Sequence, residues 1–382
     1  MKKNIIIILG AGSSVDFGLP LSTDVFYSAN EKLSFKQEHK IECEKLEKYI
    51  SQVEGVMQTI FANLPENKKE FPPFEEILTF LWNSGDKESF SGIKKQDAFN
   101  AFVKMMGLTY AASHGFVGTE HVIEKKFKYE KYIKSLVKSG ANITFLSLNY
   151  DILLDSFLKS FKEQENGFNF NYGLTLYDIR TGDEVNEDEG TSLFKPHGSL
   201  NLSSCPTCNK FLYFEDNILT PIEHQRDWCI CPFCKKSSIE PLIIPPLYNK
   251  KEFIDTPDRL TTENGRVLTT EGGDTIVVEG IFYKYRQQID AKIINALKKT
   301  DEIMIIGYSL PNYDFDFKCL LLSGLMQNKN RGNIPVKIIT KDDEPGAERL
   351  RKRFQYLAGE TTITYRHGFY EYIKRFPEYR GF

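Results

Sequence analysis

The stretch IIIILGAGSSVDFGLP (residues 5–20) decides the fold class of this chain. It begins with an unbroken run of isoleucine and leucine, which is typical of a parallel strand covered on both faces. Gly10 and Gly12 follow directly, and such glycines let the chain turn tightly and let a phosphate approach the backbone amides at a helix start. Ser13 and Ser14 are expected to cap that helix and to donate to phosphate oxygens. The stretch therefore predicts a strand, a glycine turn and a helix start that holds the diphosphate of a dinucleotide such as NAD.

Two features of the same stretch depart from a complete dinucleotide fingerprint. A third glycine would be required at position 15, where Val15 stands, and the sequence Gly18-Leu19-Pro20 is expected to end the helix early. A purely structural turn without a ligand is therefore the alternative interpretation.

The composition is that of a globular protein with a substantial core. The 382 residues are 41% hydrophobic and 26% charged, and the net charge of −3 supplies no basic field for nucleic acid. The sequence holds no apolar run long enough to span a membrane. The start, MKKNIIIIL, resembles a signal peptide, but its apolar run is short and no cleavage site follows. We therefore expect a cytoplasmic protein with reduced thiols.

Strand-like and helix-like segments alternate along much of the chain. Beyond residues 4–9, strand patterns occur at 143–151, 193–202, 239–246, 301–311, 336–340 and 361–367. A helical pattern at 283–299 lies between two of them. Such alternation predicts an α/β protein with a Rossmann-like, doubly wound parallel sheet.

The remaining segments suggest two additions to this sheet. Residues 30–135 carry charged and apolar positions at helical spacing and are expected to form a large helical insertion. Residues 205–236 contain paired cysteines and are expected to form a small zinc-ribbon-like module. The catalytic domain is then discontinuous and is expected to comprise 1–29, 136–204 and 237–382.

The segment SLNYDILL places Asn149 and Asp151 just past the end of a predicted core strand. Ligands of open α/β sheets bind at the carboxyl ends of strands. The two side chains point the same way if the chain stays extended, and they suit ribose hydroxyls and a positioned water. The alternative is that Asn-Tyr-Asp simply makes a turn.

The segment KPHGSLN places His197 between a proline and a glycine, in a loop of defined shape. Histidine is the side chain best matched to proton transfer near neutral pH, although a packed or exposed histidine without a role is the alternative. Together with Asn149 and Asp151, it could act on an N-glycosidic bond, which requires a stabilised oxocarbenium-like centre and a deprotonated water or hydroxyl.

Four cysteines form two Cys-x-x-Cys pairs, Cys205/Cys208 and Cys231/Cys234. Two such pairs supply four thiolates for a tetrahedral zinc ion, and a closed site of this kind is structural rather than catalytic. Disulfides are the alternative, which the expected cytoplasmic location disfavours. Cys229 is close enough in sequence to replace one of the ligands.

A third strand end carries residues of the ligand-binding type. IMIIGYSLP places Gly307 and Ser309 directly after a predicted core strand. The glycine permits close approach of a ligand, and the serine hydroxyl can bond a phosphate or ribose. Taken alone, this segment would equally make a plain turn.

The order of these motifs resembles the sirtuin-like family. GAGSSVDFGLP resembles the sirtuin GAGxSxxxGIP segment, LNYD its Asn-x-Asp motif, KPHGS its His-Gly motif and GYS its Gly-x-Ser motif. The cysteine pairs also follow the His-Gly segment, as in sirtuins. The resemblance covers about residues 4–28 and 140–345.

The resemblance implies residue roles. Gly10 and Ser14 belong to the first matching segment, in which Ala11, Gly12 and Ser13 would bind the cofactor. Gly307 and Ser309 would bind the adenosine side.

The same resemblance implies roles at the reacting end. Asn149 and Asp151 would bind the nicotinamide ribose, and His197 would be the catalytic base.

Two departures from the deacylase pattern are informative. Pro20 is followed by Leu21-Ser22-Thr23 where deacylases carry Asp-Phe-Arg, and LIIPPLYN (242–249) has prolines where they pair a strand with the substrate peptide. The chain looks more like the sirtuin-like effectors of bacterial antiphage defence. The implied function is NAD hydrolysis to nicotinamide and ADP-ribose, with NAD consumed as a substrate and depleted in an abortive infection. An NAD-dependent protein deacylase and a non-catalytic module that senses NAD or ADP-ribose are the alternatives.

The resemblance also bears on assembly. Such effectors form homo-oligomers, and several work with a separate protein, such as a HerA-type ATPase or an Argonaute-type protein. This chain carries neither of those domains, so the resemblance implies such a partner. Direct sequence-specific contact with nucleic acid and contact with a membrane are not expected.

Overall fold

The main sheet of the protein has seven parallel strands in the order β15-β14-β13-β1-β4-β7-β5. The computed structural model describes residues 2–35, 40–84, 89–116, 120–185, 190–215, 230–236, 239–244, 258–259, 277–278 and 281–375. The strands are β1 (Asn4–Leu9), β4 (Asn142–Ser147), β5 (Phe170–Asn171), β7 (Thr191–Phe194), β13 (Glu302–Ile306), β14 (Gly332–Ile339) and β15 (Gly359–Tyr365). This arrangement confirms the predicted parallel α/β class.

Strand β1 is the centre of the sheet because its apolar run is covered on both faces. Each of its residues from Ile5 to Leu9 is at most 2% exposed. Ile7 pairs with Met304 of β13 on one side and with Phe145 of β4 on the other. The unbroken apolar pattern is therefore what a doubly covered parallel strand requires.

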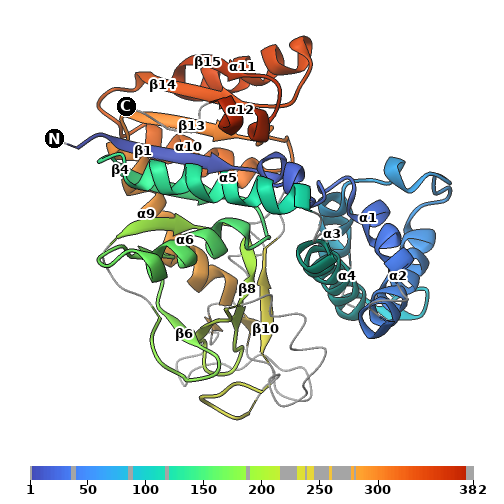
Figure 1. Ribbon diagram of the computed structural model, residues 1–382. Helices are drawn as coiled ribbons and strands as arrows, with labels where there is room; N and C mark the ends of the chain where they lie inside the picture. The colour runs from blue at the N-terminus through green and yellow to red at the C-terminus, as the bar shows by residue number, and fades with distance from the viewer. Residues whose placement is uncertain are drawn as a thin grey trace.

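Helices cover both faces of this sheet. One group consists of α5 (Glu120–Val137), α6 (Leu153–Gln164) and α12 (Phe369–Arg375), in which α5 contacts both others. The second group consists of α9 (Ile281–Lys299), α10 (Phe315–Leu325) and α11 (Glu344–Ala358), in which α10 contacts both others. Figure 1 shows α5 lying along β1 in front of the sheet, with α10 behind it. The sheet is thus doubly wound.

A group of helices stands beside the carboxyl ends of the strands (Figure 1). It consists of α1 (Val25–Lys32), α2 (Lys40–Ile60), α3 (Phe74–Asn83) and α4 (Lys95–Phe116), with the short hairpin β2 (Ser89–Phe90) and β3 (Ile93–Lys94). Helix α4 contacts each of the other three. Helix α5 falls within the predicted insertion 30–135 but contacts the sheet helices and β4. We refer to α1–α4 as the helical insertion; the domain boundaries stay a prediction.

A second, smaller sheet has the strand order β10-β8-β9-β6. Its strands are β6 (Leu176–Asp178), β8 (Gly198–Ser204), β9 (Phe211–Tyr213) and β10 (Glu240–Ile243). The segment 239–246, predicted among the strands of the parallel sheet, instead contributes β10, which pairs antiparallel with β8. Segment 193–202 likewise divides between β7 and β8, because the chain turns between Lys195 and Gly198. The remaining strands are β11 (Asp258–Arg259) and β12 (Val277–Val278).

The prediction of a helix directly after the glycine turn is wrong. Two short 3-10 turns, Ala11–Ser13 and Val15–Phe17, follow Gly10, and neither has a side-chain cap. The amide of Ser13 bonds to the carbonyl of Gly10 at 2.9 Å, which is the tighter i→i+3 pattern. Gly18, at φ 87°, ends the second turn, and the first α-helix begins only at Val25.

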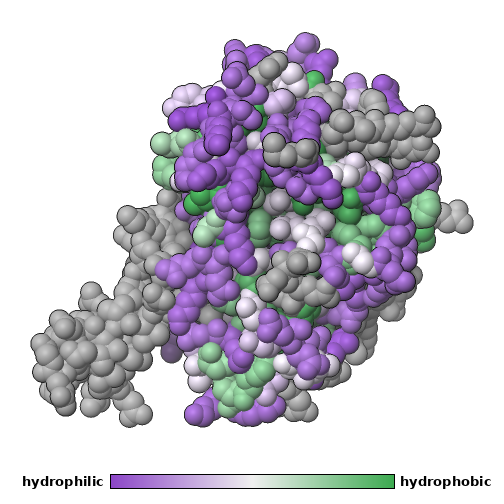
Figure 2. All heavy atoms as spheres, turned by 90° about the vertical axis from the view of Figure 1, so that its left-hand side faces the viewer, coloured by the Kyte–Doolittle hydropathy of each residue, from purple (hydrophilic) through white to green (hydrophobic). Residues whose placement is uncertain are grey.

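The molecular surface agrees with a globular fold. Figure 2 faces the amino ends of the sheet strands, where the described residues are mainly hydrophilic and the apolar residues form small separate patches. No helix in the described part of the chain is both long and apolar enough to span a bilayer.

Candidate functional site

A cavity of about 530 Å³ lies where the carboxyl ends of the central strands meet the helical insertion. Loops after β1, β4, β13 and β14 line it, and so do residues of α3 and α4. The chain passes from β1 to β4 on one side and later returns to β13 on the other side of β1. This reversal is the topological switch point, at which open α/β sheets bind their ligands.

The glycines of two strand ends pack directly against one another in the wall of this cavity. The amide of Gly12 donates to the carbonyl of Gly307 at 2.9 Å. A Cβ atom on Gly307 would lie 2.2 Å from the amide nitrogen of Ser13, and Gly307 has a φ of 61°. Most amides of the turn are therefore used within the protein, whereas that of Ala11 has no hydrogen-bond partner among the described residues. The glycines bring the two loops together, and they leave one amide of the turn for a ligand.

Asn149 is anchored to the glycine turn through its side-chain amide. Its Nδ2 atom donates to the carbonyl of Gly10 at 3.1 Å, and it lies 3.2 Å from the hydroxyls of both Ser13 and Ser14. A carbonyl oxygen can only accept, so the group that faces Gly10 must be the NH₂ group. Oδ1 of Asn149 is buried at the cavity wall and has no hydrogen-bond partner in the part of the chain that the structure describes. An unsatisfied buried acceptor of this kind is a site for a hydroxyl or a water.

Ser13 and Ser14 do not cap a helix as predicted. Both are buried, at 1% and 3% exposure, and they are not part of the cavity lining. The hydroxyl of Ser13 donates to the carbonyl of Gly10 at 2.8 Å. They hold Asn149 in place from behind rather than capping a helix.

Asp151 lines the cavity and lies two residues before the start of α6. Its Oδ1 accepts from the amide of Leu153 at 3.0 Å, and its carbonyl accepts from Nζ of Lys195 at 2.6 Å. Lys195 is 1% exposed, and it also bonds to Oδ2 of Asp155 at 3.0 Å. The carboxylate of Asp155 accepts a further bond from the hydroxyl of Tyr172 at 2.7 Å. This buried ion pair joins the strand end that carries Asp151 to the turn that precedes His197.

His197 faces a carboxylate that the sequence analysis did not single out. Its Nε2 atom lies 3.3 Å from Oδ1 of Asp314, and both residues are at most 3% exposed. The hydroxyl of Tyr308 donates to Oδ2 of the same aspartate at 2.7 Å. Asp314 precedes α10 without capping it by its side chain. The tyrosine hydroxyl, the aspartate and the imidazole thus contact one another in series, and such a series can orient the imidazole for proton transfer.

Glu75 is a second group that the sequence analysis missed. It comes from the first turn of α3, lines the cavity and is 6% exposed. Burial raises its pKa to about 8; the nearby Asp314 adds to the increase, and a hydrogen bond with Ser22 opposes it. Oε2 of Glu75 has no hydrogen-bond partner among the described residues. The signal in the sequence was a glutamate beside the apolar helical stripe of Phe74, Ile77, Leu78 and Leu81.

Charged side chains of both signs line the cavity. Glu75, Asp151 and Asp314 contribute three carboxyl groups to the lining that includes His197. The lining also includes Lys341, which is 71% exposed, and the loop from Ala11 to Gly12. Such a cavity can accept a molecule with a cationic group and an anionic group on one elongated frame.

The predicted residues after β13 also reach the cavity. Gly307 and Ser309 belong to its lining, and the carbonyl of Ser309 accepts from Nη1 of Arg353 at 3.0 Å. Gly10, Ala11 and Gly12 line it as well. The predicted site residues of four separate segments thus lie around or directly behind one cavity.

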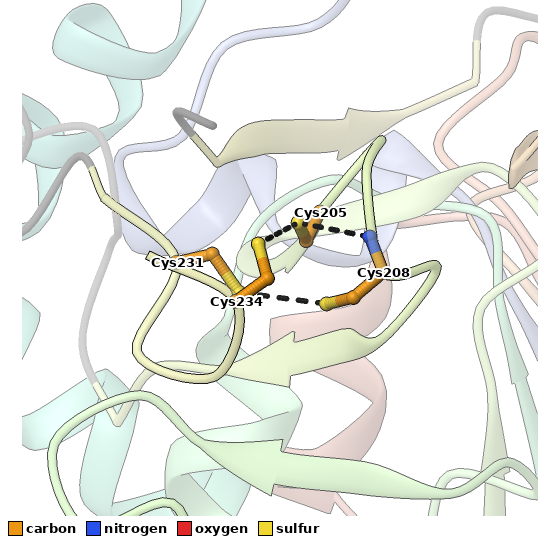
Figure 3. Close-up of side chains that lie close together, drawn as sticks. All are labelled: Cys205, Cys208, Cys231 and Cys234. Atoms are coloured by element: carbon orange, nitrogen blue, oxygen red, sulfur yellow. Dashed lines mark hydrogen bonds between the residues drawn. The ribbon is translucent and has the colours of Figure 1, made fainter. Parts of the chain in front are cut away.

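The four paired cysteines come together at one point in the second sheet region (Figure 3). Their sulfur atoms all lie within 4.8 Å of one another, with Cys205 to Cys234 and Cys208 to Cys231 both at 3.6 Å. A tetrahedral zinc with Zn–S bonds of about 2.3 Å places its sulfurs about 3.8 Å apart. Each pair is followed by a residue of positive φ, Asn209 or Lys235. The cluster fits the predicted structural zinc site.

Charge gives a second reason to expect a metal at this cluster. Burial and the neighbouring thiols raise the pKa of Cys208 to about 12. Four thiolates this close would repel one another without a cation, and a bound zinc supplies the missing charge. Cys229 lies outside the described residues.

Comparison with known proteins gives similarity at the level of structure. No protein-family model and no curated protein matches the sequence. The solved structures that it resembles include sirtuins. One, described by its substrate affinity, has a TM-score of 0.41 at 12% identity and covers 98% of this chain and 93% of its own. A Sir2 homologue bound to ADP-ribose has a TM-score of 0.40 at 13% identity, with 98% and 91% covered. Because these TM-scores are below 0.5, we assign the fold class from the strand order and describe the site from its own distances and contacts.

Proposed function

We propose that this cavity binds NAD and hydrolyses the bond between nicotinamide and ribose, giving nicotinamide and ADP-ribose. The observation that carries the proposal is the anchored amide of Asn149, whose Oδ1 is an open, buried acceptor at the cavity wall. His197 with its carboxylate partner lines the same cavity. A hydrolysis of this type needs a positioned water, a base for its proton and stabilisation of a cationic ribosyl centre.

The charges of the cavity support NAD as the substrate. The nicotinamide ring of NAD is cationic and suits the side chains of Asp151 and Asp314, beside which the buried Glu75 stays mainly protonated at neutral pH. The diphosphate is anionic and suits the amide of Ala11, and the exposed ammonium group of Lys341, which lies 3.6 Å from Oδ1 of Asp16, is a cation of the same lining. One elongated molecule would place both charges where the lining complements them.

The cavity supplies the groups that this hydrolysis requires. Water held by Oδ1 of Asn149 attacks C1′ of the ribose, and the glycosidic bond breaks as the ring nitrogen takes up the electron pair. Nicotinamide leaves as a neutral molecule, so it needs no proton from an acid. His197 takes the proton of the water, and Asp314 stabilises the resulting imidazolium. The carboxylate of Asp151 offsets the positive charge that develops on the ribose.

The test is to follow nicotinamide release from NAD by the full chain. We expect Asn149→Ala and His197→Ala each to reduce the release by at least about a hundredfold, the range of a lost general base. Glu76→Gln, an exposed neighbour on α3, is the matched control. Equal release by the parent and both variants would refute the mechanism. Release that requires an acyl-lysine peptide would instead indicate a deacylase, and NAD that stays bound and intact would indicate a sensing module.

We further propose the biological setting that the motif resemblance implies. The protein would act as an antiphage effector that depletes NAD in the cytoplasm, as a homo-oligomer with a HerA-type ATPase or another defence protein. Release of nicotinamide only after that partner is added would support this setting. Residues 245–249 of the segment that would pair with a substrate peptide lie outside the described residues, and its two prolines disfavour a deacylase.

A further inference from the structure

The contact between His197 and Asp314 joins two segments from different parts of the chain. His197 lies in the turn between β7 and β8, and Asp314 directly precedes α10. Oδ1 of Asp314 faces the imidazole, Oδ2 accepts from Tyr308, and the side chain makes no capping bond with α10. The distance of 3.3 Å between the imidazole and the carboxylate therefore depends on how the start of α10 is held beside the turn.

Helix α9 binds the turn that carries His197. The hydroxyl of Tyr285 donates to the carbonyl of Lys195 at 2.6 Å, and Tyr285 is fully buried. The amide of Gly198 donates to the same carbonyl at 2.8 Å and closes the turn around His197. These bonds fix the position of the turn relative to α9.

The next residue of α9, Arg286, binds the start of α10. Its Nη1 atom donates to Oδ2 of Asp316 at 2.8 Å, and its Nε atom donates to Oδ1 of Asp290 on α9 itself, also at 2.8 Å. Arg286 is 3% exposed; burial alone would lower its pKa, but the two carboxylates outweigh burial and raise it. Since Asp316 lies two residues after Asp314, the guanidinium group fixes the segment that carries Asp314 to α9.

We infer that Arg286 is a positioning residue, which acts through Asp316 to hold the carboxylate of Asp314 against His197. This inference rests on the proposed hydrolysis of NAD, in which Asp314 stabilises the imidazolium form of His197. A guanidinium group suits this task because its donors have a fixed, planar arrangement and so determine direction as well as distance. A displacement of about 1 Å at a catalytic group can lower a rate by about a hundredfold.

Asp290 and Asp316 form a matched pair for the test. Each accepts one bond of 2.8 Å from Arg286, and their side chains are 29% and 30% exposed, but only Asp316 belongs to α10. We expect Asp316→Ala to lower the kcat of nicotinamide release at least about fivefold, with the KM for NAD kept within about twofold. Arg286→Met should do the same, whereas Asp290→Ala should leave both constants within about twofold. Equal kcat values for Asp316→Ala and Asp290→Ala would overturn the inference.

A double-variant comparison separates positioning from general damage to the fold. Asp314→Asn already removes the charge that stabilises the imidazolium of His197. In this background, Asp316→Ala should therefore change kcat by less than about twofold, because residues that act as one unit are not additive. The same loss of rate in both backgrounds would show that Asp316 acts through the fold or through its own charge, and the inference would be wrong.

The pKa of His197 gives a readout that needs no hydrolysis. It is measured by nuclear magnetic resonance on the full chain labelled with nitrogen-15 at histidine, with the signal assigned by its absence in His197→Ala. A nearby carboxylate favours the protonated imidazole, so Asp314→Asn and Asp316→Ala should each lower the pKa of His197. Asp290→Ala should leave it unchanged, and Asp316→Ala should cause no further decrease once Asp314→Asn is present.

This measurement distinguishes the inference from the proposed function. Asp151 and Glu75 are the other acidic groups that line the cavity with His197 and Asp314, and they are the same in every variant. If the pKa of His197 follows the expected pattern but the parent releases no nicotinamide, the positioning role stands and the proposed hydrolysis fails. If the pKa in Asp316→Ala equals that of the parent, the positioning role is wrong, whether or not NAD is hydrolysed.

Discussion

Replacing Glu75 by glutamine should remove a pH-dependent penalty on the stability of the fold. The side chain is 6% exposed, and its pKa is raised from 4.5 to about 8. Between these values the unfolded chain carries an ionised glutamate while the folded chain keeps the proton. The unfolded state then binds fewer protons, so the free energy of unfolding falls as pH rises from about 4.5 and levels off above about 8. A glutamine has the same shape and does not titrate.

The size of the effect follows from the shift. Each pH unit between the two pKa values is worth about 1.4 kcal/mol, so from pH 4.5 to pH 7 the parent loses about 3 kcal/mol through this group. We therefore expect Glu75→Gln to match the parent in stability near pH 4.5 and to exceed it by about 3 kcal/mol at pH 7. The gain should change little above about pH 8.

The assay is urea unfolding at pH 5, 6, 7, 8 and 9, followed by far-ultraviolet ellipticity and by tyrosine fluorescence. Coincidence of the two transitions shows that a single free energy describes the unfolding. Glu76→Gln is the control, because this exposed neighbour lies on the same turn of α3. A difference between Glu75→Gln and the parent that is the same at every pH would refute the reasoning, since it would show that Glu75 is ionised in the fold.

Three further predictions concern Asp314, Lys195 and the cysteine cluster. Asp314→Asn should lower the rate of nicotinamide release by at least about tenfold while NAD still binds, because the amide cannot stabilise a protonated His197; an unchanged rate in a kinetic assay would contradict this role. Lys195→Met should lower the free energy of unfolding by about 3–5 kcal/mol, as expected when one partner of a buried ion pair is removed, and urea unfolding that shows under 1 kcal/mol would argue against the pair. Elemental analysis should find one zinc per chain, and Cys208→Ser should reduce both the zinc content and the melting temperature; a metal-free parent of equal stability would exclude the structural zinc.

Local patterns in the sequence were sufficient for much of the fold and part of the site. The apolar runs of β1 and β13 predicted their strands, because a doubly covered strand needs no polar position. The two Cys-x-x-Cys pairs predicted a metal cluster from spacing alone, and their sulfur atoms do meet. Asn149, Asp151 and His197 line one cavity, as expected for residues that follow closely on strands, because the strand ends of a parallel sheet share one edge.

Some local predictions failed because a distant residue supplies the hydrogen-bond partner. The glycine turn continues as two 3-10 turns rather than a helix, and Ser13 and Ser14 bond to Asn149 rather than to helix amides. Nothing in the segment itself indicated this outcome, because the partner lies 135 residues away in sequence.

The sequence by itself thus determined the parallel sheet, the paired cysteines and the residues at the strand ends, because a pattern of a few neighbouring residues indicates each of them. Only the tertiary structure decided which distant groups complete the cavity. Asp314 reaches His197 from the start of α10, and Glu75 arrives from an inserted helix. Their roles depend on how deeply each side chain is buried and on which charged groups lie near it in space. The spacing of residues along the sequence does not reveal either property.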